Sequence, residues 1–330
     1  MIRINNIINF LKVTFGKTVI GLIYYPWRTV EKLLGISFGA NSKSHYYIMM
    51  FFRFFFSAFV VIIAFRNRLM KAPQTIRLRV DLCQNNQQWF FRLRDKYEIE
   101  WMKLIAKSMG SADSFIDIGS NVGLYAVTVA QLFPHKKVIA VEPLNENFLT
   151  LNENIKLNSL SNIKAIKATV SNQEGGKTYF YPNPIHDGGG SVIKSPVYRT
   201  GSISIDAESF QKKNPEFCKE FEIQNIKLDE IIDSQSVIKI DVEGAEVSVL
   251  ESGKTCFKKG LVDMVVIEVL DETIDAVIQF FDELGFDCFA IDCSHPLKVS
   301  DRLKWFVGNI YCLRRGSQLY RSLKGEIYFV

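Results

Sequence analysis

Residues 115–125 read Phe115-Ile-Asp-Ile-Gly-Ser-Asn-Val-Gly-Leu-Tyr125, and this stretch decides the fold. An apolar run ends in an acid, Asp117, and two glycines follow at Gly119 and Gly123 before an apolar segment resumes. This order predicts a strand, a tight glycine turn and the start of a helix. Such a unit brings a nucleotide-bearing cofactor against backbone N–H groups.

The next predicted strand is Lys137-Val-Ile-Ala-Val-Glu-Pro143, and its acid Glu142 lies 25 residues after Asp117. An acid at this position can accept hydrogen bonds from ribose hydroxyls. Dinucleotide-binding folds use Gly-x-Gly-x-x-Gly, whose backbone approaches a pyrophosphate. Here the spacing is Gly-x-x-x-Gly, and Asp117 would repel a pyrophosphate. The sequence therefore favours a cofactor with a cationic amino-acid end, such as S-adenosylmethionine, although a turn that binds no ligand has the same pattern.

A third apolar strand also ends in acids, within Val237-Ile-Lys-Ile-Asp-Val-Glu-Gly-Ala-Glu-Val247. Asp241, Glu243 and Glu246 surround Gly244 there. In an open parallel sheet, ligands bind beyond the carboxyl ends of the strands. We therefore expect Asp241 to share one crevice with the acids of the first two strands. Each carboxylate could instead have no function in the crevice and be a solvated loop charge or a helix cap. For Glu246, the functional and the structural interpretation are equally open.

Together these three motifs, with Leu151-Asn152, Leu157-Asn158 and Lys227–Ile232, resemble the FkbM family of S-adenosylmethionine-dependent methyltransferases. The resemblance runs from about Glu98 to Arg314 and leaves out the first 70 residues. It implies O-methylation of a hydroxyl, often on a sugar, a polyketide or another secondary metabolite. It does not identify the acceptor.

Methyl transfer to a hydroxyl requires a bound cofactor and a group that removes the hydroxyl proton. For the base we expect Asp241 or Glu243, with His186 as a third candidate on a polar loop. A divalent cation held by carboxylates stays an open alternative, although nothing else supports a metal. The expected cofactor-binding residues are Asp117, Gly119, Ser120, Asn121, Gly123, Glu142, Pro143, Ala168 and Asp241.

Strand and helix patterns alternate along most of the chain, which predicts an α/β, Rossmann-like class I methyltransferase fold. Its sheet should be mostly parallel and seven-stranded, with an antiparallel C-terminal hairpin. Residues 171–226 form an irregular insertion, which we assign to acceptor binding. The predicted strands are 114–118, 137–141, 162–168, 237–241, 262–269, 286–292 and 308–314, and the predicted helices are 97–109, 123–133, 145–158, 245–252 and 271–284, with a short one near 228–233.

Residues 1–72 form a different kind of sequence, which we expect to be an apolar helical extension before a methyltransferase domain at 73–330. Tyr46–Phe65 contains 18 apolar residues out of 20, a length that suits a membrane span. Arg53 and Ser57 lie on a polar stripe, which suits a helix in the membrane interface or in a partner's groove. A buried core helix is the remaining alternative. No cleavage-site pattern follows a basic start, so we do not expect a signal peptide.

Composition excludes some classes of function. The formal net charge is +5 and charged residues make up 23% of the chain, too mild a bias for nucleic-acid binding. The six cysteines form no C-x-x-C pair, so we expect reduced, buried thiols and a cytoplasmic location. If the protein attaches to a membrane, we expect it at the cytoplasmic face. The expected partner is a small-molecule or glycan acceptor.

Three rival functions remain. A nicotinamide-dependent oxidoreductase and a nucleotide-sugar enzyme are disfavoured by the glycine spacing and by the lack of a Tyr-x-x-x-Lys pair in a helical setting. A membrane-tethered binding protein with an inactive methyltransferase fold is disfavoured by the intact acids Asp117, Glu142 and Asp241, which an inactive site would not need.

Overall fold

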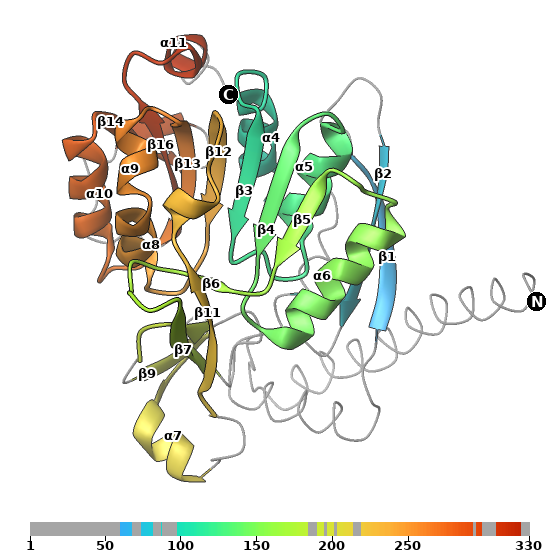
Figure 1. The fold of residues 1–330 in the computed structure, drawn as a ribbon, viewed down its shortest axis with the longest axis vertical. Helices are drawn as coiled ribbons and strands as arrows, with labels where there is room; N and C mark the ends of the chain where they lie inside the picture. Colours follow the sequence, from blue (N-terminus) through green and yellow to red (C-terminus); the bar gives the residue numbers. More distant parts are fainter. Residues whose placement is uncertain are drawn as a thin grey trace, which may run out of the picture.

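The computed structural model describes residues 60–67, 74–81, 87, 98–183, 190–194, 197–200, 203–213, 219–292, 295–298 and 308–324. These residues form a central eight-stranded sheet between two helical layers, with a smaller sheet beyond one end of it (Figure 1). Helices and strands of the central sheet alternate along the chain, as the sequence pattern predicts.

The central sheet has the order β15-β14-β16-β13-β12-β3-β4-β5. From β5 to β13 neighbouring strands are parallel, and β16 is antiparallel to both β13 and β14. Strands β3 and β12 are buried along their whole length, as expected for parallel strands covered on both faces. The strands are β3 (Ser114–Ile118), β4 (Lys137–Val141), β5 (Ile163–Ile166), β12 (Ser236–Ile240), β13 (Val262–Val269), β14 (Phe286–Asp292), β15 (His295–Lys298) and β16 (Gly308–Arg314).

Two apolar cores lie on opposite faces of this sheet. The first packs against α4 (Ile99–Ser108), α5 (Leu124–Leu132), α6 (Asn145–Leu157) and α11 (Gln318–Lys324). The second packs against the short 3₁₀ helix η3 (Leu228–Glu230), α8 (Glu246–Ser252), α9 (Lys254–Lys258) and α10 (Ile274–Glu283). Eight of the nine residues of α5 are buried, because a β-hairpin covers the side that faces away from the sheet.

This hairpin consists of β1 (Val60–Asn67) and β2 (Gln74–Asp81), paired antiparallel. The helix expected over Tyr46–Phe65 is therefore wrong from Val60 onward, because backbone pairing with β2 overrides the helical pattern. The hairpin also crosses the expected boundary at residues 72 and 73. Residues 1–59 and 68–72, which hold the rest of the expected extension, lie outside the described part of the chain. Among the described residues, no helix is both long and apolar enough to cross a bilayer.

Asn154 of α6 and Asn158, the residue directly after this helix, bind the backbone of β2. The Asn154 side chain accepts from the Arg79 N–H at 2.6 Å and donates to the Arg79 carbonyl at 3.2 Å. Asn158 makes the same pair of bonds to Arg77, at 2.9 and 2.6 Å. Asn154 also donates to the carbonyl of Val122, in the glycine turn, at 2.8 Å. The two amides thus replace a neighbouring strand and tie the hairpin to the turn after β3.

The insertion at 171–226 is not irregular, which corrects the sequence-based expectation. It contributes to a second sheet of order β6-β11-β7-β8, in which β11 pairs parallel with β6 and antiparallel with β7. A separate two-stranded hairpin and a helix follow β8. The elements are β6 (Thr169–Val170), β7 (Lys177–Pro182), β8 (Gly190–Ser191), β9 (Val197–Thr200), β10 (Ile203–Asp206), α7 (Ala207–Lys213) and β11 (Phe221–Ile226).

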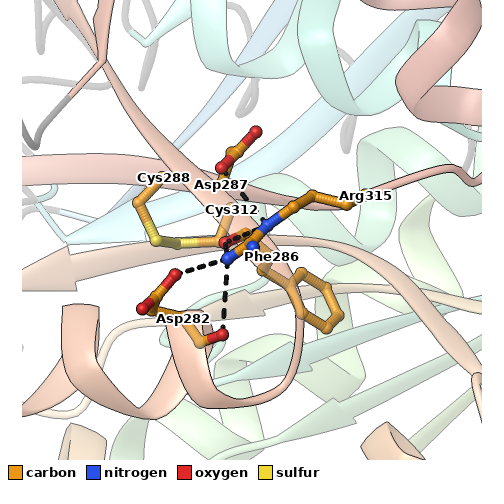
Figure 2. Close-up of a disulfide and its surroundings, with 6 residues drawn as sticks. All are labelled: Asp282, Phe286, Asp287, Cys288, Cys312 and Arg315. Atoms are coloured by element: carbon orange, nitrogen blue, oxygen red, sulfur yellow. Dashed lines mark hydrogen bonds and ion pairs between the residues drawn. A yellow bond between two sulfur atoms is a disulfide. The ribbon is translucent and has the colours of Figure 1, made fainter.

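The expectation of reduced thiols is wrong for two of the three cysteines that the structure describes. Cys288 of β14 lies directly opposite Cys312 of β16, and the two form a disulfide (Figure 2). Arg315 connects the start of β14 to α10, because it donates to the carbonyl of Phe286 at 2.9 Å and pairs with the carboxylate of Asp282 in α10. Cys256 is a buried free thiol, as expected. The disulfide removes part of the argument for a reducing compartment.

Candidate active site

A cleft opens at the carboxyl ends of β3, β4 and β12, where Figure 1 shows the arrowheads of β3 and β4 pointing toward the small sheet. Its empty space, which includes open solvent, is about 480 Å³. The walls combine apolar side chains with three carboxylates. The cleft is lined by Ile118, Gly119, Val141–Leu144, Ala168–Val170, Phe180, Gly190–Val192, Asp241–Glu243 and Ala245.

The glycine turn forms the floor next to β12. Gly119 has a φ of 77°, and a Cβ there would lie 1.8 Å from the carbonyl oxygen of Asp241. Asn121 also has a left-handed backbone, with φ of 50°. Gly123, with φ of 92°, precedes α5 and has no room for a Cβ beside Leu151. The two glycines are therefore required by the close approach of β12 and α6, and not only by a ligand.

Glu142 lies where the sequence predicts, at the end of β4 and in the cleft wall. One carboxylate oxygen accepts from the Asn121 N–H at 2.8 Å and the other from the Leu144 N–H at 2.9 Å. Burial raises the pKa of Glu142 to about 7, and these hydrogen bonds limit the increase. The carboxylate is thus held rigidly by the glycine turn, with acceptor capacity left for a ligand.

Asp117 is buried at the end of β3 and does not line the cleft. Its carboxylate accepts from the N–H of Ala126, in the first turn of α5, at 3.0 Å. Burial raises the pKa of Asp117 to about 7, while nearby Lys239 acts in the opposite direction. The structure places Asp117 behind the glycine turn, so direct contact with a cofactor stays a prediction.

The acids after β12 separate into two groups. Asp241 and Glu243 line the cleft, and Glu243 has a left-handed backbone with φ of 52°. Glu246 is buried and accepts from the Gly244 N–H at 2.7 Å, so its carboxylate holds the turn together. Burial raises the pKa of Glu246. Of the two interpretations left open for Glu246, the structure supports a local structural role.

The remaining predicted residues have mixed outcomes. Pro143 and Ala168 line the cleft as expected. Ser120 is buried, with its hydroxyl donating to the Val141 carbonyl at 3.3 Å, and neither it nor Asn121 reaches the cleft wall. His186 lies outside the described residues. Within the described ranges, no group of three or more His, Cys, Asp or Glu side chains is placed to hold a metal ion.

Sequence reasoning missed a group of polar residues behind Asp241. Lys239 is 1% exposed and its Nζ lies 3.1 Å from a carboxylate oxygen of Asp241. The Tyr125 hydroxyl donates to Glu98. Glu268 of β13 lies beside Asp241 in the β12–β13 register, and the charge of Asp241, with burial, raises the pKa of Glu268 well above its ordinary range. The sequence does contain a signal for this group, because Lys239 and Glu268 are charged residues inside the apolar runs Val-Ile-Lys-Ile and Val-Ile-Glu-Val.

The chemistry of the residues that line the cleft matches the chemical groups of S-adenosylmethionine. Glu142 offers a fixed carboxylate for a ribose diol, and Ala168 and Val170 offer an apolar wall for a flat base. Asp241 and Glu243 lie in the same cleft, where their carboxylates would stabilise a cationic group. The order of the seven strands from β14 to β5 is the order of class I methyltransferase sheets, and β15 adds an eighth strand.

Comparison with known proteins agrees with this arrangement. A family model described as the methyltransferase FkbM domain matches residues 117–288, more than half of the chain. The chain belongs to the FkbM methyltransferase family. The family and the fold are those of enzymes that use S-adenosylmethionine. This is the cofactor that the sequence predicts.

Two curated relatives carry methyltransferase names. "Methyltransferase 1" of Beauveria bassiana is 26% identical over 171 residues, which is 49% of this chain and 67% of that protein. "Methyltransferase sdnD" of Sordaria araneosa is 27% identical over 157 residues, which is 41% of this chain and 58% of that protein. The matches thus span about three fifths to two thirds of the relatives' length.

The chain is also similar to solved methyltransferase structures. Precorrin-6y C5,15-methyltransferase of Geobacter metallireducens GS-15 is 13% identical, with a TM-score of 0.39, over 68% of this chain and 91% of that chain. M. jannaschii TYW2 in complex with AdoMet is 14% identical, with a TM-score of 0.36, over 72% of this chain and 81% of that chain.

Proposed function

We propose that this FkbM-family methyltransferase transfers a methyl group to a hydroxyl oxygen of a sugar, glycan, lipid-linked saccharide or secondary metabolite. One observation carries the proposal: Glu142, our candidate for ribose binding, lines the same cleft as Asp241 and Glu243, our candidates for the base. A hydroxyl is a weak nucleophile at neutral pH, so its methylation benefits from a carboxylate that removes its proton.

In this proposal Glu142 accepts hydrogen bonds from the ribose hydroxyls, and Ala168 and Val170 contact the adenine. S-adenosylmethionine, when bound, supplies an electrophilic methyl group on a sulfonium. The work of the protein is then to hold the acceptor oxygen in line with that methyl group and to remove the hydroxyl proton. Asp241 is our first candidate for the base and Glu243 the second.

The small sheet supports the acceptor class. Phe180 of β7, with Ser191 and Val192 at β8, forms the outer wall of the cleft. This wall offers apolar surface and a hydroxyl together, which suits a ligand with both C–H faces and hydroxyl groups. The part of the chain that we assigned to acceptor binding from the sequence thus borders the cleft, and the assignment stays a proposal.

Calorimetry with S-adenosylmethionine and with NAD tests the cofactor. We expect binding of S-adenosylmethionine only, and tight NAD binding alone would overturn the proposal. Transfer of an isotope-labelled methyl group to a panel of sugars, lipid-linked saccharides and polyketide alcohols then tests the acceptor. Label in an ether product that is lost with Asp241→Asn supports O-methylation. Cofactor binding without transfer to any acceptor or cell extract would favour an inactive binding protein.

We also propose that the enzyme works in the cytoplasm, where its cofactor is made, and attaches to a membrane or an apolar partner through residues before Val60. The support is the apolar composition of Tyr46–Phe65. A long apolar surface without a covering partner would favour aggregation.

A further inference from the structure

Four acidic residues surround one buried lysine behind the cleft. In the parallel register of β3 and β12, Asp117 is the partner of Lys239, so the two side chains lie on the same face of the sheet. Asp241, two residues after Lys239, lies on that face as well. Ile240 pairs with Ile267 in the register of β12 and β13, so Asp241 stands beside Glu268.

Helices α4 and α5 close this face. Tyr125 of α5 lies under the lysine, with Nζ 5.5 Å from the centre of its ring, and its hydroxyl donates to Glu98 at the start of α4. Burial by itself would lower the pKa of Lys239. The carboxylates of Asp241, Glu98, Glu268 and Asp117 more than offset this effect, so the pKa lies above its ordinary value and the amine is a cation.

One cation cannot balance these carboxylates if all are ionised at close range. Asp241 has the direct ion pair with Lys239, at 3.1 Å, and Glu268 stands beside Asp241, whose charge raises the pKa of the Glu268 carboxyl. Two adjacent carboxyl groups can hydrogen-bond only if one of them carries a proton. Opposite Glu268 in the β13–β16 register lies Asn309, whose buried Oδ1 has no hydrogen-bond partner within the described structure. A protonated Glu268 would therefore find acceptors around it.

We propose that Asp241 and Glu268 act as a proton-sharing pair, in which Lys239 keeps Asp241 ionised as the base for the acceptor hydroxyl while Glu268 carries the proton. This rests on the proposed function, since the base needs a hydroxyl to act on. The acceptor oxygen bonds to the methyl carbon, the electron pair of the broken carbon–sulfur bond stays on sulfur, and the hydroxyl proton passes to Asp241. Lys239 and Glu268 are positioning residues, because they act through Asp241.

Carbon-13 NMR of the full chain, with labelled Asp and Glu carboxyl carbons, tests the pair without an acceptor. The other titratable groups around the pair are Lys239, Asp117, Glu98, Tyr125 and Glu243. We expect a glutamate carboxyl signal that titrates above pH 8, far above the ordinary range, because the charge of Asp241 and burial both raise the pKa of Glu268. Wild-type protein with no carboxyl titration above pH 8 would overturn the proposal.

Variants assign the signal. Glu268→Gln should abolish it, and Asp241→Asn should move it to lower pH. Lys239→Met should move it to higher pH by about one to three units, because a cation stabilises carboxylates, while Lys239→Arg should leave it nearly in place. Asp233→Asn, an exposed carboxylate paired with Lys137, is the control and should change nothing. If Lys239→Met does not fold, the Glu268→Gln and Asp241→Asn spectra still decide.

Kinetics with the acceptor found by the labelled-methyl assay test the base role. In a plot of the rate against pH, the acid limb of Lys239→Met should lie at a pH higher by about one to three units than in the wild type. In Lys239→Arg, which keeps the cation, the limb should lie close to its wild-type position. A lysine with only a structural role would lower the rate without moving the limb, and that result would overturn the proposal. If wild-type protein binds S-adenosylmethionine but lacks the high-pH carboxyl signal, the pair fails and the proposed function stands. If it does not bind S-adenosylmethionine, the proposed function fails, and the base role with it.

Discussion

At the scale of the residue, Glu142 connects cofactor binding to pH. Its pKa is raised by burial to about 7, so its ionised fraction rises through neutral pH. An ionised carboxylate is the better acceptor for ribose hydroxyls. We expect affinity for S-adenosylmethionine to increase from pH 6 to pH 8, by calorimetry. Glu142→Gln should weaken binding by about 1.5–3 kcal/mol at pH 8 and flatten this dependence. An unchanged affinity would contradict the ribose assignment.

The raised pKa of Glu142 also predicts how the stability of the fold depends on pH. The folded state holds the Glu142 proton more tightly than the unfolded chain, whose carboxyl has a pKa near 4.5. The contribution of this group is therefore fully present below about pH 4.5 and is lost as pH rises toward 7. Urea unfolding of wild type and Glu142→Gln from pH 5 to 8 should show a steeper loss of stability in the wild type. Parallel curves would count against burial as the cause.

Gly119 gives a second prediction at this scale. Gly119→Ala places a Cβ within 1.8 Å of a backbone oxygen of Asp241 and forces a left-handed alanine. Gly175 is the matched control, because its φ is 99° but a Cβ added there would meet nothing within 4 Å. Gly175→Ala should lower the free energy of unfolding by about 1–2 kcal/mol, through the strain of a left-handed alanine alone. Gly119→Ala should cost clearly more in urea unfolding and should weaken cofactor binding, since Asp241 must move. Equal costs would mean that the turn adapts freely.

At the scale of the element, the contact between α6 and β2 depends on asparagine side chains. Asn154 is fully buried and makes three hydrogen bonds to backbone groups of Arg79 and Val122. Asn154→Ala should destabilise the protein by about 1–3 kcal/mol, because buried backbone groups lose their partners. Amide hydrogen exchange at Arg79 should accelerate.

Asn152→Ala is the control on the same helix. Within the described residues, the Asn152 amide donates to the Phe148 carbonyl, one turn earlier in α6, and to no group of β2. Its replacement should change the free energy of unfolding by less than about 0.5 kcal/mol. If both alanine variants have the same stability, the hairpin is held by its apolar side chains and the asparagines contribute little.

At the scale of the whole molecule, the hairpin decides where the chain can be shortened. A cut at Pro73, the boundary suggested by the sequence, would remove β1 and leave the backbone of β2 unpaired along one edge. Exposed edges favour self-association. We expect a chain starting at Val60 to remain monomeric by light scattering and to bind S-adenosylmethionine, and one starting at Pro73 to melt earlier and associate. Equal melting temperatures would show that β1 is dispensable.

The proposed attachment is tested with the same truncation. The full chain should partition with membranes or a partner fraction, and the chain that starts at Val60 should not. Arg53→Leu separates the two membrane modes, because loss of the cation should strengthen a span and disturb a helix whose polar stripe faces water. Full-length protein that stays monomeric and soluble without detergent would contradict attachment.

The sequence by itself determined most of the central sheet and the ends of several of its strands, although β5 is shorter than the predicted 162–168, β12 begins and ends one residue before the predicted 237–241, and β15 was not predicted. Strands 114–118, 137–141 and 262–269 were predicted with the bounds that the structure has, because a buried parallel strand is a continuous apolar run with an abrupt end. The same rule placed Glu142 and Asp241 in the cleft, since the carboxyl ends of parallel strands meet at one edge. These features are local in the chain, so local patterns suffice.

Only the tertiary structure decided the features that depend on pairing between distant segments. Val60–Phe65 has a helical apolar pattern but forms β1, because β2 supplies hydrogen bonds along its length. The small sheet depends on Asn225 pairing with Thr169, and the disulfide on the register of β14 against β16. Register likewise brings Lys239, Asp241 and Glu268 together. A contact between segments far apart depends on how the strands align, and neither composition nor periodicity encodes that alignment.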